Sequence, residues 1–285
     1  MKLLFSEGRP DYSHYLFPYV VWAFPEPGET PADLLAAGFL PSSRQLDRFY
    51  LCRQIRVHLP SFRPSSENRR ILRRGEAFEV TLLPRSQFDW TPERRDFCLA
   101  YARARFGPEV MTGARLDELM NSPMTTHIWQ VRLRAGGAEV GLATLYLEPP
   151  RAAYYSYAFY DLGWRQLSLG MFMMTSAVEW LARQRFEFLY LGTCYSRNAL
   201  YKTQFAGAEF FNGFRWSRNL DELKHLLARD SRPALESHLL ESRDYRESFC
   251  PAPLSSLAAQ HGFRAVPPHP QAPDRPDFSS SGTHH

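Results

Sequence analysis

The stretch from residue 152 to residue 191 reads AAYYSYAFYDLGWRQLSLGMFMMTSAVEWLARQRFEFLYL. Its first part, Ala152 to Asp161, is dense in aromatic residues, which favour β-strands. Ser168 to Arg185 carries apolar residues at helical spacing, and Phe186 to Leu191 places aromatic residues at every second position, as a strand does. Strand, helix and strand in this order predict a right-handed crossover between two strands of an α/β sheet.

Further elements extend this sheet towards the N-terminus. Thr91 to Phe106 predicts a helix, because Thr91 is a good N-cap and a proline follows it in the first turn. Ile128 to Arg134 and Glu139 to Glu148 predict an antiparallel hairpin across a turn that contains two glycines. The predicted fold class is therefore α/β, with a mixed sheet flanked by helices.

The chain has 285 residues, enough for one large domain or two smaller ones. We predict an N-terminal α+β domain, in which Thr30 to Gly38 forms a short helix and Phe49 to Leu59 a strand. Arg232 to Arg246 predicts a polar helix, and the composition from Pro251 onward cannot bury a core and predicts disorder. The predicted limits are 1–77 for the N-terminal domain, 78–227 for the α/β domain, 228–250 for the C-terminal helix and 251–285 for the tail.

Composition places the chain among ordinary globular proteins, with 44% hydrophobic and 22% charged residues. No stretch has the roughly 18 consecutive apolar residues of a membrane span, so we predict no membrane partner. The first ten residues lack the apolar run of a signal peptide. The four cysteines lie far apart and are typical of free thiols in a reducing compartment. We therefore expect a cytoplasmic protein.

Positive charge is concentrated near the N-terminus, although the net charge is only +4. Nine arginines lie between Arg44 and Arg74, against Asp47 and Glu67 as the only acidic residues. Such a concentration indicates an anionic partner, with nucleic acid first, or else a solvated basic face. A helix capped at residue 65 or 66 places four arginines on one side. They are Arg69, Arg70, Arg73 and Arg74.

The junction between the aromatic strand and the following helix has the features of an anion site. Free backbone N–H groups and the positive end of the dipole lie at a helix start. Acetyltransferases of the GNAT type place R/Q-x-x-G-x-G/A here to hold the coenzyme A pyrophosphate, and the corresponding residues are Arg165-Gln-Leu-Ser168-Leu-Gly170. Ser168 replaces the first glycine, which restricts close backbone approach. Alternatively, Ser168 only caps the helix.

A series of spaced motifs is more specific than this loop. The motifs are Ser156-Tyr-Ala-Phe-Tyr-Asp161, Ser168-Leu-Gly170, Tyr190-Leu-Gly192, Tyr201-Lys202-x-x-Phe205 and Ala208-Glu209. Together they resemble the C-terminal domain of the aminoacyl-tRNA–protein transferases, the arginyl- and leucyl-transferase family. Upstream segments resemble the N-terminal domain of the family: Leu35-x-x-Gly38-Phe39, Tyr50-x-Cys52-x-x-x-Arg56-Val57, Phe62-x-Pro64-Ser65 and Arg69-Arg70-x-Leu72-Arg73. The resemblance covers roughly Tyr19 to Asn219 and implies a GNAT-like acyltransferase domain.

Several positions depart from the family pattern. Some members hold an iron–sulfur cluster with several N-terminal cysteines. Of those family positions, only the one at Cys52 is a cysteine in this chain. One thiolate cannot anchor a cluster that needs four ligands, so we predict no metal and no cofactor beyond the charged tRNA. Leu162, Thr193 and Gly207 replace a proline, a tyrosine and a proline of the family motifs. These changes leave the donated amino acid and the acceptor open.

The resemblance implies transfer of an aminoacyl group, arginine or leucine, from aminoacyl-tRNA to the N-terminal amine of a protein or peptide that begins with an acidic residue. Such a transfer marks proteins for degradation. An aminoacyl ester is already activated, so the enzyme needs positioning and oxyanion stabilisation more than a strong base. We expect the tRNA to contact arginines of the basic region and of the junction. These are Arg56, Arg69, Arg70, Arg73, Arg74 and Arg165.

The expected catalytic residues surround the junction. Backbone near Tyr160 and the Ser168–Gly170 helix start would stabilise the reacting carbonyl, and Asp161 would receive an ammonium group. Tyr195 or Tyr201 would pass a proton to the leaving ribose hydroxyl. Lys202 would pair with an acidic acceptor side chain or a terminal phosphate.

Each of these residues also has a structural interpretation. The aromatic strand can belong to the sheet core, and Asp161 can end its strand in a turn. Lys202 can pair with Glu209 on the surface, and Trp164 either stacks on the terminal adenine or packs in its loop. Three other functions remain open. They are an acetyl-CoA-dependent N-acetyltransferase, a non-catalytic RNA-binding protein, and a tRNA-dependent ligase that acts on a small molecule or peptide.

Overall fold

The computed structural model describes residues 1–7, 19–230 and 239–261. Contacts divide the chain into two compact units, Met1–His238 and Leu239–His285. The limits predicted from composition at residues 77, 227 and 250 stay predictions.

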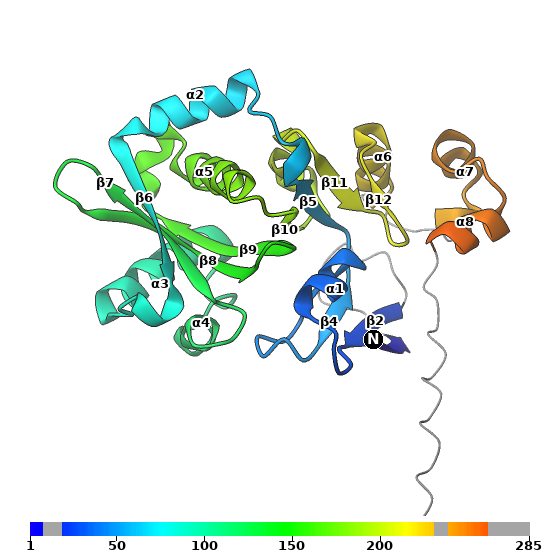
Figure 1. Ribbon diagram of the computed structural model, residues 1–285, viewed down its shortest axis with the longest axis horizontal. Helices are drawn as coiled ribbons and strands as arrows, with labels where there is room; N and C mark the ends of the chain where they lie inside the picture. Colours follow the sequence, from blue (N-terminus) through cyan, green and yellow to red (C-terminus); the bar gives the residue numbers. More distant parts are fainter. Residues whose placement is uncertain (8–18, 231–238, 262–285) are drawn as a thin grey trace, which may run out of the picture. The chain divides into compact units, whose positions relative to one another are not determined.

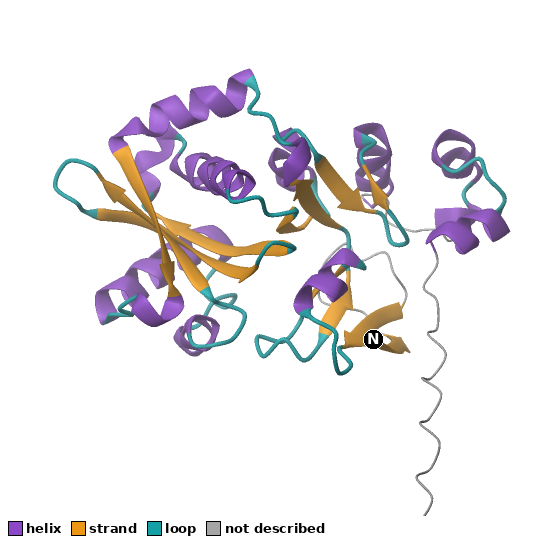
Figure 2. Cartoon of the chain, in the orientation of Figure 1, coloured by secondary structure: helices purple, strands orange, loops and turns teal. Residues whose placement is uncertain are grey.

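An eight-stranded sheet forms the centre of the first unit, in the order β12-β11-β5-β10-β9-β8-β7-β6 (Figures 1 and 2). Strand β9 lies parallel to β10 and the other pairs are antiparallel, so the predicted crossover and the predicted hairpin β7–β8 are both confirmed. The strands are β5 (Gln54–His58), β6 (Phe78–Pro84), β7 (His127–Leu133), β8 (Glu139–Glu148), β9 (Ala152–Tyr160), β10 (Phe188–Thr193), β11 (Ala208–Phe211) and β12 (Trp216–Ser217).

Helices cover both faces of the β6–β9 part of this sheet, which establishes the predicted α/β class (Figure 1). Helices α2 (Ser66–Arg74) and α5 (Leu169–Arg183) lie on one face, where Trp129 of β7 contacts Trp180. Helices α3 (Pro92–Phe106) and α4 (Gly113–Met120) lie on the other face. There they pack on Ile128, Leu142 and Phe159. The same unit contains α6 (Leu220–Asp230) and the 3-10 segments η1 (Leu59–Ser61), η2 (Gly75–Ala77), η3 (Arg85–Gln87), η4 (Leu162–Leu167) and η5 (Arg197–Gln204).

Local sequence explains where the helices begin. The side chain of Ser65 accepts a hydrogen bond from the backbone of Asn68, and Thr91 accepts one from Arg94. Each hydroxyl satisfies a backbone N–H group that the helix itself leaves free. Both predicted N-caps are therefore confirmed, and α3 ends at Phe106 as expected.

A smaller sheet with the order β1-β2-β4-β3 holds the N-terminal residues. Its elements are β1 (Lys2–Glu7), β2 (Tyr19–Phe24), β3 (Phe39–Pro41), β4 (Phe49–Leu51) and helix α1 (Pro31–Ala36). The strand predicted over Phe49 to Leu59 is in fact two strands, because the chain leaves the small sheet after Leu51 and enters the large sheet at Gln54. Apolar pattern alone does not reveal such a change of sheet.

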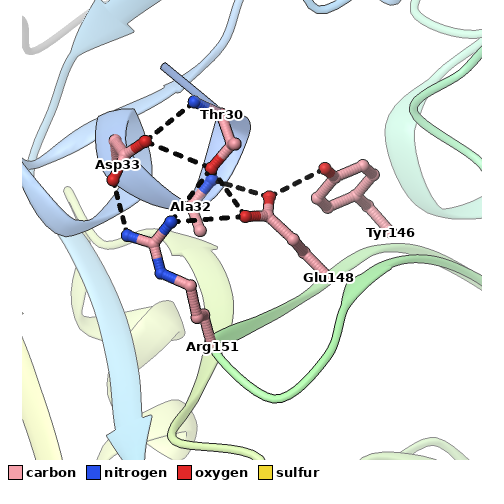
Figure 3. A network of polar contacts seen from close by, with 6 residues as sticks. All are labelled: Thr30, Ala32, Asp33, Tyr146, Glu148 and Arg151. Atoms are coloured by element: carbon pink, nitrogen blue, oxygen red, sulfur yellow. Dashed lines mark hydrogen bonds and ion pairs between the residues drawn. The ribbon is translucent and has the colours of Figure 1, made fainter. Parts of the chain in front are cut away.

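A polar network ties α1 to the turn between β8 and β9 (Figure 3). Glu148 accepts hydrogen bonds from the Thr30 hydroxyl at 2.6 Å, the Ala32 backbone N–H at 3.0 Å and the Tyr146 hydroxyl at 2.9 Å. Arg151 donates to Asp33 and to Thr30. The carboxylate of Glu148 thus joins the small sheet region to the large sheet.

The second unit contains a 3-10 turn η6 (Leu239–Glu241), α7 (Arg243–Phe249) and α8 (Leu254–His261). Tyr245 contacts Phe249 within this unit, with ring centroids 5.5 Å apart. Part of the helix predicted over Arg232 to Arg246 falls outside the described residues, and α7 begins at Arg243. Helix α8 shows that the predicted disorder does not begin at Pro251, while residues 262–285 lie outside the described part. Across 1–7, 19–230 and 239–261, every helix is too short or too polar to cross a membrane.

Candidate functional site

The two parallel strands of the large sheet separate after three pairs of residues. Ala152 to Tyr154 of β9 pair with Phe188 to Tyr190 of β10, and beyond this point β9 continues to Tyr160 paired only with β8. The separation exposes one edge of β9 and its backbone groups. A cavity of about 690 Å³ lies there, lined by β9, the start of α5, the end of α3 and η5.

A β-bulge shapes the wall that β9 contributes. Tyr155 lies opposite Leu145 and Tyr157 opposite Thr144, so Ser156 is the extra residue. A bulge bends its strand and redirects side chains. Tyr155 is 4% exposed and lines the cavity, and its hydroxyl makes no hydrogen bond with any residue that the structure describes. An unsatisfied buried hydroxyl is costly, so it is a natural donor for a bound molecule.

The helix start at Gly170 forms the opposite wall. A Cβ atom at Gly170 would lie 2.6 Å from the ring of Tyr160, so only glycine lets this ring approach the helix. Tyr160 in turn contacts Tyr101 of α3, with ring centroids 4.7 Å apart. Burial, aided by the hydrogen bond with Tyr160, raises the pKa of Tyr101. Ser168 has a left-handed φ of 56°, makes no side-chain capping bond to the helix, and lines the cavity.

Lys202 places an amine in the cavity. Its Nζ donates to the backbone oxygen of Thr193 at 2.9 Å, and burial lowers the pKa of the amine. The alternative of a surface pair with Glu209 does not occur, because Glu209 binds Arg56 and Arg218 instead. A buried amine without a carboxylate partner loses its proton more readily than a surface lysine.

The charge of the cavity is uniformly positive. Arg105, Arg165 and Lys202 line it, and its described lining includes no aspartate or glutamate. Arg105 and Arg165 are exposed, and neither forms an ion pair with a residue of the described ranges. The cavity therefore suits an anionic ligand, since unpaired guanidinium groups bind phosphate and carboxylate groups.

The structure brings together six of the residues predicted from the sequence as a site. Each of these six lines the cavity: Tyr160, Arg165, Ser168, Gly170, Tyr201 and Lys202. Sequence reasoning missed Tyr101 and Arg105 of α3 and the hydroxyl of Tyr155. The spacing of apolar residues predicts the helix α3 itself. It does not predict that the end of α3 contacts β9, because this contact joins distant parts of the chain.

Three other predicted residues lie outside the cavity. Asp161 is exposed and its carboxylate accepts a hydrogen bond from the backbone of Gly163 at 2.8 Å, as in a turn. The Tyr195 hydroxyl accepts one from the Arg53 backbone at 2.8 Å. Arg56 is buried, with its guanidinium 3.9 Å and 3.8 Å from the ring centres of Phe188 and Trp216. These groups have structural partners where they stand.

The arginines of α2 differ in what they contact. Arg70 binds Glu67 in the same helix, and Arg69 donates to the Pro64 carbonyl at 2.6 Å. Arg73 and Arg74 are exposed in the last turn and form no ion pair with any residue of the described segments. The last turn of α2 therefore offers two free guanidinium groups.

All four cysteines are free and buried. In the ranges that the structure covers, no three histidine, cysteine or acidic side chains are grouped to hold a metal ion.

Comparison with known proteins gives one family match, over the central part of the chain. Residues 99–212 match the family described as "Arginine-tRNA-protein transferase, C terminus". The match covers the part of the chain that holds the C-terminal motifs, and it supports the resemblance to this family that those motifs indicate. A search of curated protein sequences gave no significant match.

Solved structures with a similar arrangement are distant. The C-terminal domain of a putative lysylphosphatidylglycerol synthetase from Agrobacterium fabrum is 17% identical, with a TM-score of 0.40 over 53% of this chain and 49% of that one. FemX is 10% identical, with a TM-score of 0.40 over 57% and 59%. A tandem GNAT protein from the clavulanic acid pathway is 13% identical, with a TM-score of 0.33 over 50% and 44%. The chain spans about half the length of these proteins. The GNAT-like description therefore depends on topology, since β9, α5 and β10 form the parallel crossover with separating strands.

Proposed function

We propose that this protein transfers an aminoacyl group from aminoacyl-tRNA to an amine. The observation that carries the proposal is the cavity between the separating strands β9 and β10. It is positively charged, holds a buried amine and lies in the segment that matches the transferase family. A ligand that fits this cavity is an ester attached to a polyanion.

The reaction needs few groups from the protein. The amine of the acceptor attacks the ester carbonyl, a C–N bond forms, and the C–O bond to the ribose breaks. An N-terminal amine has a reference pKa of roughly 7.7–8.0, so part of it is neutral at cellular pH. Tyr155 and the backbone N–H groups of Leu169 and Gly170 donate to the developing oxyanion, whereas the Ser168 N–H already donates to the Arg165 carbonyl at 2.9 Å. Neutral Lys202 accepts the proton that the amine loses and passes it to the ribose oxygen as that oxygen leaves.

The charge of the cavity favours one pair of substrates. A donated arginine would bring a cation beside Arg105 and Arg165, and the described lining of the cavity has no carboxylate to pair with it. A leucyl group carries no charge and fits beside Met171, Met174 and Leu191, which line the same cavity. An acceptor that begins with aspartate or glutamate would pair with the cations. We therefore infer leucyl transfer to acidic N-termini, in the cytoplasm, as a signal for degradation.

The body of the tRNA is assigned to the last turn of α2. Arg73 and Arg74 are exposed there, whereas Arg69 and Arg70 already have hydrogen-bond partners. Arg165 at the cavity supplies a further phosphate contact. Arg56 contributes to the fold through its pair with Glu209 and makes no phosphate contact in this assignment.

The experiment that tests the function uses the purified full chain with labelled leucyl-tRNA or arginyl-tRNA. The acceptors are peptides that begin with aspartate, glutamate, alanine or acetylated aspartate. We expect label from leucyl-tRNA in the first two peptides only. Transfer without tRNA from acetyl-CoA, or tRNA binding without transfer to any acceptor, would contradict the proposal.

Two lysine variants show whether the cavity performs the transfer. Lys202→Met removes the buried amine and should lower the single-turnover rate by about 10²–10⁴-fold, the range for loss of a proton-transfer group. Lys224→Met is the control, because Lys224 lies on the surface of α6, outside the cavity lining, and pairs with Asp221. Equal rates for the two variants would remove Lys202 from the mechanism.

A further inference from the structure

Two large aromatic side chains at the cavity are unusually exposed. Phe106, the last residue of α3, is 40% exposed, and Tyr201 of η5 is 46% exposed. Both line the cavity between β9 and β10. Two exposed rings at one cavity provide aromatic surface on which a flat ligand can stack.

Arg105 accompanies the two rings. It precedes Phe106 in the chain, lines the same cavity, and interacts with the phenol groups of Tyr101 and Tyr201. Tyr101 also supports the ring of Phe106, at a centroid distance of 5.8 Å and an angle of 81°. A guanidinium group beside aromatic rings is the combination with which proteins hold a nucleobase and its phosphate.

Trp164, which the sequence offered as the residue for such stacking, is placed differently. Its ring packs edge-on against Phe78, with centroids 5.7 Å apart, and it is not part of the cavity lining. Packing against the edge strand β6 accounts for this tryptophan. The rings at the cavity itself are therefore the ones available to a ligand.

We propose that Phe106, Tyr201 and Arg105 bind the 3′-terminal adenosine of the tRNA. The adenine stacks on the two rings and the phosphate on its 5′ side pairs with Arg105. This assignment rests on the proposed function and names the part of the substrate that the mouth of the cavity recognises. With the adenosine held there, its aminoacyl ester enters the cavity towards Tyr155 and Lys202.

The test uses a tRNA whose 3′-terminal adenine is replaced by 2-aminopurine, a fluorescent base that stacking quenches. Titration with the full chain gives both the quench and the dissociation constant. Phe106→Ala and Tyr201→Ala should each weaken binding by about 5- to 150-fold and reduce the quench, since stacking of one base on one ring contributes a factor of this size. Tyr201→Phe keeps the ring and should keep the quench.

Matched variants separate the rings from other effects. Val110→Ala alters an exposed apolar residue near the end of α3 that is not part of the cavity lining and should change nothing. Arg73→Glu should weaken binding while leaving the quench at saturation unchanged, because it acts on the tRNA body. Circular dichroism confirms that each variant is folded.

The outcomes distinguish this proposal from the proposed function. If leucyl transfer occurs but the Phe106→Ala, Tyr201→Ala double variant keeps the full quench and affinity, the adenosine site is wrong and the function stands. If the quench is lost in the ring variants but the native protein transfers no amino acid, the site stands and the function is wrong. An absence of any quench with the native protein overturns the adenosine site directly.

Discussion

Glu148 is the residue whose replacement should most clearly disturb the joint between the N-terminal region and the large sheet. Its carboxylate is 19% exposed and accepts hydrogen bonds from Thr30, Ala32 and Tyr146 (Figure 3). A hydrogen bond to a charged group contributes about 1.5–3 kcal/mol, and a buried donor left without a partner costs about 1–3 kcal/mol. Partial exposure lowers the total, because water replaces some of the lost contacts. We expect Glu148→Ala to reduce the free energy of unfolding by about 2–4 kcal/mol.

Arg151→Ala provides the matched comparison within the same network. Arg151 is 46% exposed and its partner Asp33 is 36% exposed, and an ion pair on the surface contributes about 0–1 kcal/mol. Glu148→Gln keeps the shape but presents an amide NH₂ to at least one donor, so its cost should fall between those of the other two variants. The order of the three costs follows from burial and not from the number of ion pairs.

Two measurements check this order. Urea denaturation of each variant gives the midpoint and slope, from which differences in unfolding free energy follow. Hydrogen exchange of the Ala32 amide reports the local contact, because Glu148 is its acceptor. If Arg151→Ala costs as much as Glu148→Ala, or if exchange at Ala32 is the same in Glu148→Ala as in the native protein, the reasoning from burial is refuted.

Three further predictions concern the cavity, the pH dependence and the sheet. Gly170→Ala should lower single-turnover transfer by at least about tenfold with the fold retained by circular dichroism, because the new methyl group displaces the ring of Tyr160. The hydrogen bond from Arg151 lowers the pKa of Asp33 in the folded protein. The ionised carboxylate of Asp33 therefore stabilises the fold above its unfolded pKa near 4, and this stabilisation is lost as the pH falls through the folded pKa. Asp33→Asn should lower the midpoint of urea unfolding at pH 7 but not at about pH 2. Deleting residues 1–58 removes β5 and should give insoluble protein on expression, since β10 and β11 both lose their partner strand.

Local pattern was sufficient for elements whose signals lie within a few residues. The crossover β9–α5–β10 was predictable because aromatic alternation gives way to helical spacing near residue 168 and returns near 186. The caps at Ser65 and Thr91 were predictable because capping joins residues three apart. The bounds of β10 depend on contacts with distant parts of the chain. The strand runs from Phe188 to Thr193, two residues later than its pattern indicated, because its pairing with β5 continues to Thr193.

Pairing between distant parts of the chain determines which residues form the site. The sequence alone did not predict this pairing. Tyr160, Ser168 and Lys202 were found because motifs placed them near the strand end. Tyr101 and Arg105 were not, since they lie on a helix some 50 residues upstream whose end meets β9 only in the folded chain. Arg56 shows the converse. It belongs to a basic segment, yet its strand β5 carries it into the centre of the sheet beside Glu209.

The position of β5 and α2 determines how the tRNA contacts proposed for α2 relate to the cavity. Strand β5 lies between β10 and β11, and α2, which follows it, packs on α5 so closely that a Cβ atom at Gly75 would overlap the ring of Phe172. The start of the same α5 forms one wall of the cavity. The free arginines of α2 are therefore fixed relative to the reacting carbonyl by packed helices and not by a loop. Removing their charge should weaken tRNA binding and its salt dependence, while the rate of transfer from bound aminoacyl-tRNA stays the same, because no atom near the carbonyl has moved.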